Sequence, residues 1–121
     1  MSRVYLLADD PYFRRNLERA LRKQSHLVHT SALGDFHAAQ VREFEPDVVV
    51  LDLASNGASA PVRLALLRDP ELAEVPLIAV AASLEEARAF GAHAYVPRSL
   101  PVDAVPELLE TLLRPLRPPL P

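Results

Sequence analysis

Two apolar runs, each ended by carboxylates, constrain the fold of this chain more than any other feature. The run Val48–Leu51 ends at Asp52, and the earlier run Val4–Ala8 ends at the acidic pair Asp9 and Asp10. Short unbroken runs of β-branched and aliphatic residues are typical of strands buried on both faces, as in parallel sheets. Open α/β sheets bind ligands where the carboxyl ends of such strands meet. We therefore expect Asp9 and Asp52 to share an acidic pocket suited to Mg²⁺.

The remaining chain alternates between strand and helix patterns, which predicts an α/β fold. This fold is a doubly wound, five-stranded parallel sheet in the order 2-1-3-4-5. Asp10 directly precedes a proline and is interpreted as a helix N-cap. The predicted strands cover residues 3–8, 26–32, 47–53, 76–82 and 93–96. The predicted helices cover residues 11–24, the segment that follows 34–35 and ends at 44, 61–68, a short segment from 83 to before 91, and 102–113.

Length and composition indicate one domain. A chain of 121 residues with 50% hydrophobic content supports a single core. We expect a domain over residues 1–114 and an extended, proline-rich tail over residues 115–121. The absence of cysteine excludes disulfides and thiol catalysis, and it fits a reducing cytoplasm. The formal net charge of -3 gives no reason to expect nucleic-acid binding, and no apolar run approaches the length of a membrane span.

The order of the elements and the residues at the strand ends resemble the receiver domain of bacterial two-component response regulators, over about residues 3–114. The resemblance implies a flavodoxin-like receiver fold whose phosphoacceptor Asp takes a phosphoryl group from a histidine kinase with the help of Mg²⁺. Asp52 stands at the phosphoacceptor position, and Tyr95 stands at the switch aromatic of the fifth strand. Arg98 replaces the usual Lys and is the candidate contact to a phosphoryl group.

Several positions depart from the family pattern. Ala8 stands where the first acidic residue belongs, and Ala81 stands where a Ser or Thr hydroxyl is usual. Ser83 would restore that hydroxyl only with a two-residue shift, and its spacing to Glu86 favours a capping box instead. Metal ligation would then fall to Asp9, Asp52 and the backbone carbonyl of Ala54, which implies weak binding of Mg²⁺.

Two functions follow as hypotheses. The first is an atypical stand-alone receiver that acts in signal transduction mainly as a protein-interaction module, with weak or no phosphorylation. The alternative is a phosphoryl-accepting receiver that uses Asp52 with Mg²⁺ and altered kinetics. The resemblance implies a histidine kinase or a downstream effector as partner and leaves a homodimer open. No Gly-rich phosphate loop or catalytic Cys/His pair appears, so we expect no enzyme, and scarce glycine disfavours a flavin- or nucleotide-binding domain.

Overall fold

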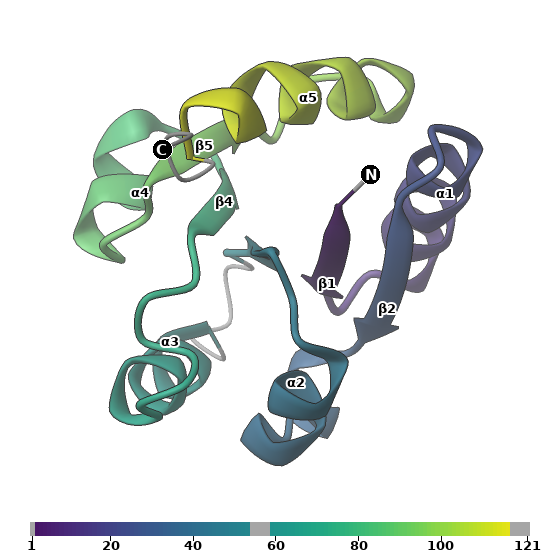
Figure 1. The fold of residues 1–121 in the computed structure, drawn as a ribbon. Helices are drawn as coiled ribbons and strands as arrows, with labels where there is room; N and C mark the ends of the chain where they lie inside the picture. Colours follow the sequence, from purple (N-terminus) through teal and green to yellow (C-terminus); the bar gives the residue numbers. More distant parts are fainter. Residues whose placement is uncertain (1, 54–58, 117–121) are drawn as a thin grey trace.

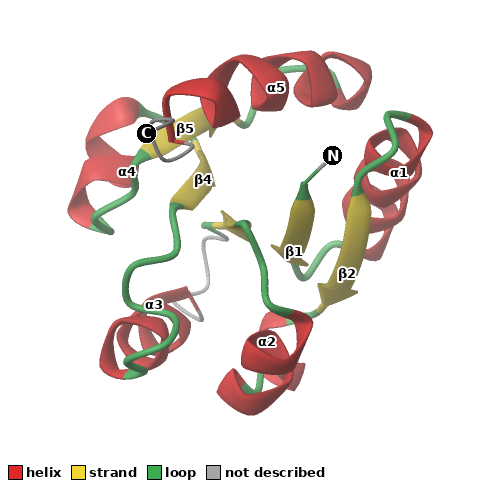
Figure 2. Ribbon diagram, viewed as in Figure 1, coloured by secondary structure: helices red, strands yellow, loops and turns green. Residues whose placement is uncertain are grey.

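The computed structural model describes residues 2–53 and 59–116, which form a five-stranded parallel sheet with helices on both faces (Figures 1 and 2). The strand order is β2-β1-β3-β4-β5, which confirms the predicted fold class. The strands are β1 (Arg3–Leu7), β2 (Leu27–Ser31), β3 (Val48–Asp52), β4 (Leu77–Ala81) and β5 (Ala94–Pro97). The helices are α1 (Pro11–Lys23), α2 (Ala38–Phe44), α3 (Ser59–Arg68), α4 (Leu84–Ala89) and α5 (Val105–Leu116). Short 3₁₀ turns, Leu33–Asp35 and Val102–Ala104, precede α2 and α5.

Burial explains why the central strands were predictable from sequence. Every residue of β3 and β4 is buried, and so are the last four residues of β1. A strand that is covered on both faces needs apolar side chains at every position, which an unbroken apolar run provides. The edge strands β2 and β5 are only partly buried, in line with their more polar sequences.

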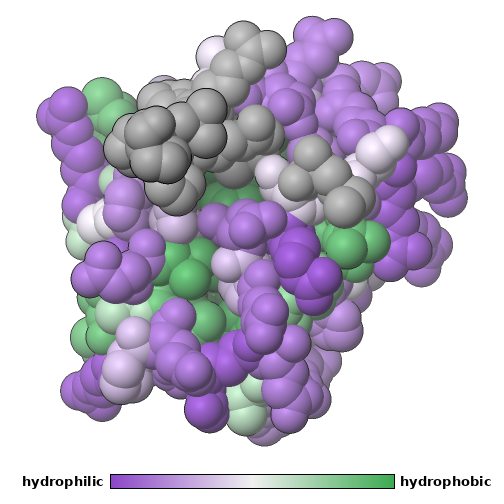
Figure 3. Space-filling view, viewed as in Figure 1, coloured by the Kyte–Doolittle hydropathy of each residue, from purple (hydrophilic) through white to green (hydrophobic). Residues whose placement is uncertain are grey.

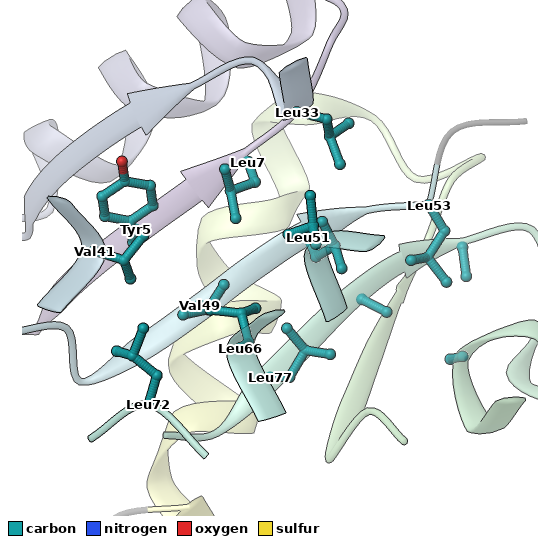
Figure 4. Packing of buried hydrophobic residues seen from close by; sticks show 14 residues of the cluster. Tyr5, Leu7, Leu33, Val41, Val49, Leu51, Leu53, Leu66, Leu72 and Leu77 are labelled. Atoms are coloured by element: carbon teal, nitrogen blue, oxygen red, sulfur yellow. The ribbon is translucent and has the colours of Figure 1, made fainter. Parts of the chain in front are cut away.

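Two apolar layers flank the sheet. On one face α1 and α5 contribute Leu17, Leu21, Val105 and Leu109, which pack with alternate residues of the strands. On the other face α2, α3 and α4 pack over the second cluster, in which Tyr5, Leu7 and further residues lie between sheet and helices (Figure 4). The alternation of strand side chains between the two layers sets the side on which each strand-end residue lies.

Caps at the helix ends agree with the sequence patterns. Asp10 caps α1, since its Oδ1 accepts hydrogen bonds from the backbone N–H groups of Tyr12 and Phe13 at 2.9 and 3.3 Å. Ser83 caps α4, and its Oγ accepts from the N–H of Glu86 at 3.2 Å. Helix α4 has six residues, as short as expected.

The last helix differs from its prediction at both ends. The residues 102–104 form a 3₁₀ turn, so α5 begins at Val105, and it continues to Leu116, three residues beyond the predicted end. Pro106 lies in its first turn, where a missing N–H costs no helical hydrogen bond. The first residues of the expected extended tail are therefore helical, and residues 117–121 lie outside the described part of the chain.

A buried arginine joins α3 to the turn between α4 and β5. Arg63 donates from Nε to the carbonyl of Phe90 at 2.7 Å and from Nη2 to that of Gly91 at 3.0 Å. Burial lowers the pKa of the Arg63 guanidinium. Gly91 has φ of 68°, which favours glycine, and a Cβ there would also lie 3.3 Å from Arg63 Nη2 and crowd the guanidinium.

Polar side chains cover much of the face that Figure 1 presents, and apolar side chains gather near its middle (Figure 3). No helix within the described ranges is long and apolar enough to cross a bilayer.

Candidate functional site

The candidate site lies at the carboxyl edge of the central strands. In the sheet register Leu7 is level with Leu51, Asp52 with Val80, and Ala81 with Pro97. The residues that follow β1, β3 and β5 therefore emerge at one edge of the sheet, as the sequence predicts. This edge brings Asp9, Asp52 and Arg98 to the same end of the molecule.

Asp52 is the most buried carboxylate of this edge. It is the last residue of β3, and only 4% of its surface is exposed. Burial raises the pKa of the Asp52 carboxyl above its ordinary value, and the nearby charges of Asp10 and Asp9 raise it further. The guanidinium of Arg98 acts in the opposite direction, and the pKa of Asp52 remains raised.

Arg98 connects the ends of three strands. Its Nη1 lies 2.8 Å from Oδ1 of Asp52, and its Nη2 donates to the carbonyl oxygens of Leu53 at 2.6 Å and Val80 at 3.3 Å. Its backbone N–H also donates to the carbonyl of Ala81 at 2.8 Å. The planar fork of arginine allows one side chain to meet the Asp52 carboxylate and the carbonyls of Leu53 and Val80, which a compact ammonium does less readily. The carboxylate of Asp52 therefore already has an internal cation as partner.

The two acidic residues after β1 have separate structural roles. Oδ1 of Asp9 accepts a hydrogen bond from the N–H of Leu33 at 2.8 Å, which ties the end of β1 to the turn after β2. Asp10 caps α1 as described, and it also faces the hollow beside Asp52. The sequence pattern predicts only the capping role of Asp10.

The expected magnesium ligands are only partly assembled. Among the described residues, no group of three or more His, Cys, Asp or Glu side chains is placed to hold a metal ion. Asp9 and Asp52 remain as two carboxylates at one edge, each with one oxygen already engaged. Ala54, whose carbonyl was the third expected ligand, lies outside the described residues. This donor set fits Mg²⁺ weakly at best, since the ion would depend on its own waters for most of its coordination.

The other positions that are functional in receiver domains are either apolar here or lie on the face of the sheet that packs against the second cluster. Ala8 and Ala81 are fully buried methyl groups and offer no oxygen to a metal or phosphoryl group. Tyr95 is half-buried and packs against the second cluster, in which Ala81 also lies. Ser59, which sequence reasoning missed, is buried at the start of α3 and donates from Oγ to the backbone carbonyl of Asp52 at 3.2 Å.

A cavity of about 360 Å³ opens directly beside Asp52. It lies between the start of α1, the ends of β4 and β5, and the start of α5. Its polar wall contains Asp10, Asp52 and Arg98, and the rest of its lining is formed by Tyr12, Phe13, Val80, Val96, Pro97, Leu100 and Val105. This volume is within the range of small-molecule sites, which are mostly apolar with a few polar groups.

Comparisons with known proteins agree with this fold. The chain superimposes on the chemotaxis response regulator CheY4 of Vibrio cholerae with a TM-score of 0.78 and 17% identity, over 93% of this chain and 98% of that one. It superimposes on the response regulator TrrA of Thermotoga maritima, solved in complex with Mg²⁺-BeF, with a TM-score of 0.72 and 21% identity, over 93% and 99% of the two chains.

Sequence comparison gives a shorter match. The transcriptional regulatory protein AfsQ1 of Streptomyces coelicolor is 39% identical over 57 residues, which are 47% of this chain and 25% of that protein. The match therefore spans a quarter of the relative. No model of a known protein family matches the chain. The structural comparisons establish that the chain has the fold of response regulator receiver domains.

Proposed function

We propose that this chain, which has the receiver fold of response regulators, acts in signal transduction mainly as a protein-interaction module, with weak or no phosphorylation of Asp52. One observation carries the proposal: the guanidinium of Arg98 lies against the buried Asp52 carboxylate and is held there by two backbone carbonyls. An aspartate that is to be phosphorylated must present an ionised oxygen to the donor. Here burial favours the neutral acid, and the ionised form has a fixed partner.

The groups around Asp52 would also hold a phosphoryl group poorly. Transfer to a carboxylate is stabilised by cations and hydrogen-bond donors placed around the phosphoryl oxygens. Ala8 removes a carboxylate that would organise a metal, and Ala81 removes a hydroxyl donor. Arg98 keeps the positive charge, but its Nη2 is already used by the carbonyls of Leu53 and Val80. A phosphorylated state would therefore form slowly and be held by few contacts.

The alternative is a phosphoryl-accepting receiver with altered kinetics. In this case Asp52 is the phosphoacceptor, Asp9, Asp52 and the carbonyl of Ala54 hold Mg²⁺, Arg98 contacts the phosphoryl group, and Tyr95 responds as the switch. The cavity favours this possibility because Asp52, although only 4% exposed, forms part of its wall. Arg98 would then have to leave Asp52 when the metal or the phosphoryl group binds.

The proposed partners are signalling proteins, either a histidine kinase or a downstream effector, and a homodimer is compatible with the fold. The matched relative is a transcriptional regulatory protein by name. Within this chain the acidic net charge of -3 favours protein partners over nucleic acid. We propose a cytoplasmic location, because the proposed signalling partners act there. We also propose that the chain has no enzymatic activity of its own.

Labelling with a small phosphodonor separates the two functions. The purified chain is incubated with acetyl phosphate and Mg²⁺, and the mass gain of one phosphoryl group is followed over time by intact-mass spectrometry. Three proteins are compared: the wild type, Asp52→Asn, and Arg98→Lys, which restores the residue usual in the family. We expect little labelling of the wild type, and more labelling of Arg98→Lys. Rapid, near-complete labelling of the wild type that Asp52→Asn abolishes would establish the alternative.

A further inference from the structure

The cavity beside Asp52 is a built site that the proposed function does not use. Its charged lining residues are Asp10, Asp52 and Arg98, which form its polar wall. Its apolar lining comes from three elements: Phe13 of α1, Val96 of β5, and Val105 of α5. A ligand that fits must therefore combine an apolar body with one polar group at its end.

The charges of the polar wall determine whether a positive or a negative ligand group is favoured there. Above the raised pKa of Asp52, two carboxylates, Asp10 and Asp52, face one guanidinium, and the wall then carries more negative than positive charge. Arg98 is already directed toward Asp52 and the strand-end carbonyls, which leaves it poorly available to a ligand anion. Oδ1 of Asp10 is occupied by the α1 cap, and the carboxylate still presents its negative charge to the cavity. A ligand carboxylate would be repelled, whereas an ammonium group would be attracted and could donate to the carboxylate oxygens.

We propose that this cavity binds a small primary amine with an apolar body. The ammonium group lies at Asp10 and Asp52, and the apolar part lies between Phe13, Leu100 and Val105. The bound molecule contacts α1, the carboxyl end of the sheet and the start of α5 together. This inference goes beyond the proposed function, and it rests on the part of that function which leaves Asp52 unphosphorylated.

The test uses three probes of similar shape in amide NMR titrations: 2-phenylethylamine, the neutral 2-phenylethanol, and the anionic 3-phenylpropionate. We expect saturable shifts from the amine that are centred on Phe13, Val96 and Leu100. We expect about tenfold weaker binding of the alcohol, because a charged hydrogen bond is lost, and no binding of the anion. Added salt should weaken binding of the amine and leave binding of the alcohol unchanged.

Matched variants locate the ammonium group. Asp10→Asn keeps a good N-cap for α1 and removes the charge, so the amine should bind several-fold more weakly while the alcohol is unaffected. Asp103→Asn is the control, since Asp103 is exposed and lines a different hollow. Leu100→Ala should weaken amine and alcohol alike. The proposal is overturned if the amine gives no saturable shifts, if alcohol or anion binds as tightly as the amine, if the shifts lie elsewhere, or if Asp103→Asn has the same effect as Asp10→Asn.

Discussion

Replacing Asp52 with asparagine is expected to stabilise the protein at neutral pH. The side chain is almost completely buried, and burial is the largest influence on its pKa, which lies above the ordinary value. A buried ionised carboxylate loses several kcal/mol of hydration, and the single contact from Arg98 returns only part of this. Asparagine has nearly the same shape and keeps an oxygen for Arg98, but it carries no charge.

The expected gain is about 1–2 kcal/mol in the free energy of unfolding, the size typical of a good stabilising substitution. For 121 residues the entropy of unfolding converts this to a rise of roughly 4–8 °C in Tm. The effect should depend on pH. The folded state holds the Asp52 proton more tightly than the unfolded chain does, so the contribution of Asp52 to stability falls as pH rises from about 4 through the raised folded pKa. The advantage of Asp52→Asn over the wild type should grow across that window and then level off.

Thermal and urea unfolding followed by circular dichroism at several pH values checks this prediction. Glu18→Gln is the matched control, because it also removes one carboxylate charge, but from a partly exposed i,i+4 pair with Arg22 at 2.8 Å. That change should cost no more than about 0.5 kcal/mol. If Asp52→Asn unfolds at a lower temperature than the wild type at pH 7, the ion pair with Arg98 outweighs burial and the reasoning about Asp52 is wrong.

Three further changes test the described contacts by the same unfolding assays. Gly91→Ala should destabilise by about 1–2 kcal/mol, because a Cβ is strained at φ of 68° and meets Arg63; an unchanged Tm would contradict this. Ser83→Ala should cost about 1 kcal/mol through loss of the α4 cap, whereas Ser83→Asp should restore it, and equal loss in both variants would refute the capping role. Arg63→Met should cost more than about 1 kcal/mol, since it leaves the carbonyls of Phe90 and Gly91 without their donor, and a neutral result would show that water replaces it.

The strands of the sheet were predictable because the apolar pattern that marks each strand is local in the sequence. The buried runs of β1, β3 and β4 are continuous in sequence, so their boundaries agree with the structure to about one residue. Helix caps were predictable for the same reason, since Asp10 and Ser83 act on residues two or three positions away. The start of α5 was not predictable to this precision, because a 3₁₀ turn and an α-helix share similar apolar spacing over a few residues.

The site was predictable only in part, because its decisive contacts join residues far apart in the chain. Sequence reasoning placed Asp52 and Arg98 at one edge, yet the approach of Arg98 to Leu53 depends on how three strands are staggered. Buried polar contacts were missed for the same reason. His26 is buried and accepts a hydrogen bond from the N–H of Ser2 at 3.1 Å, and its Nε2 lies 2.5 Å from Glu110 of α5.

The most direct test of the account is an amide NMR titration with Mg²⁺ followed by beryllofluoride, which mimics an aspartyl phosphate without depending on the lifetime of a real one. The wild type, Asp52→Asn and Arg98→Lys are compared under the same conditions. Because Arg98 is already paired with the Asp52 carboxylate, we predict that the wild-type spectrum stays essentially unchanged and that any response is larger in Arg98→Lys. Large wild-type shifts at Asp9, Asp52 and Arg98 that are absent in Asp52→Asn would contradict the account and identify a working phosphoacceptor site.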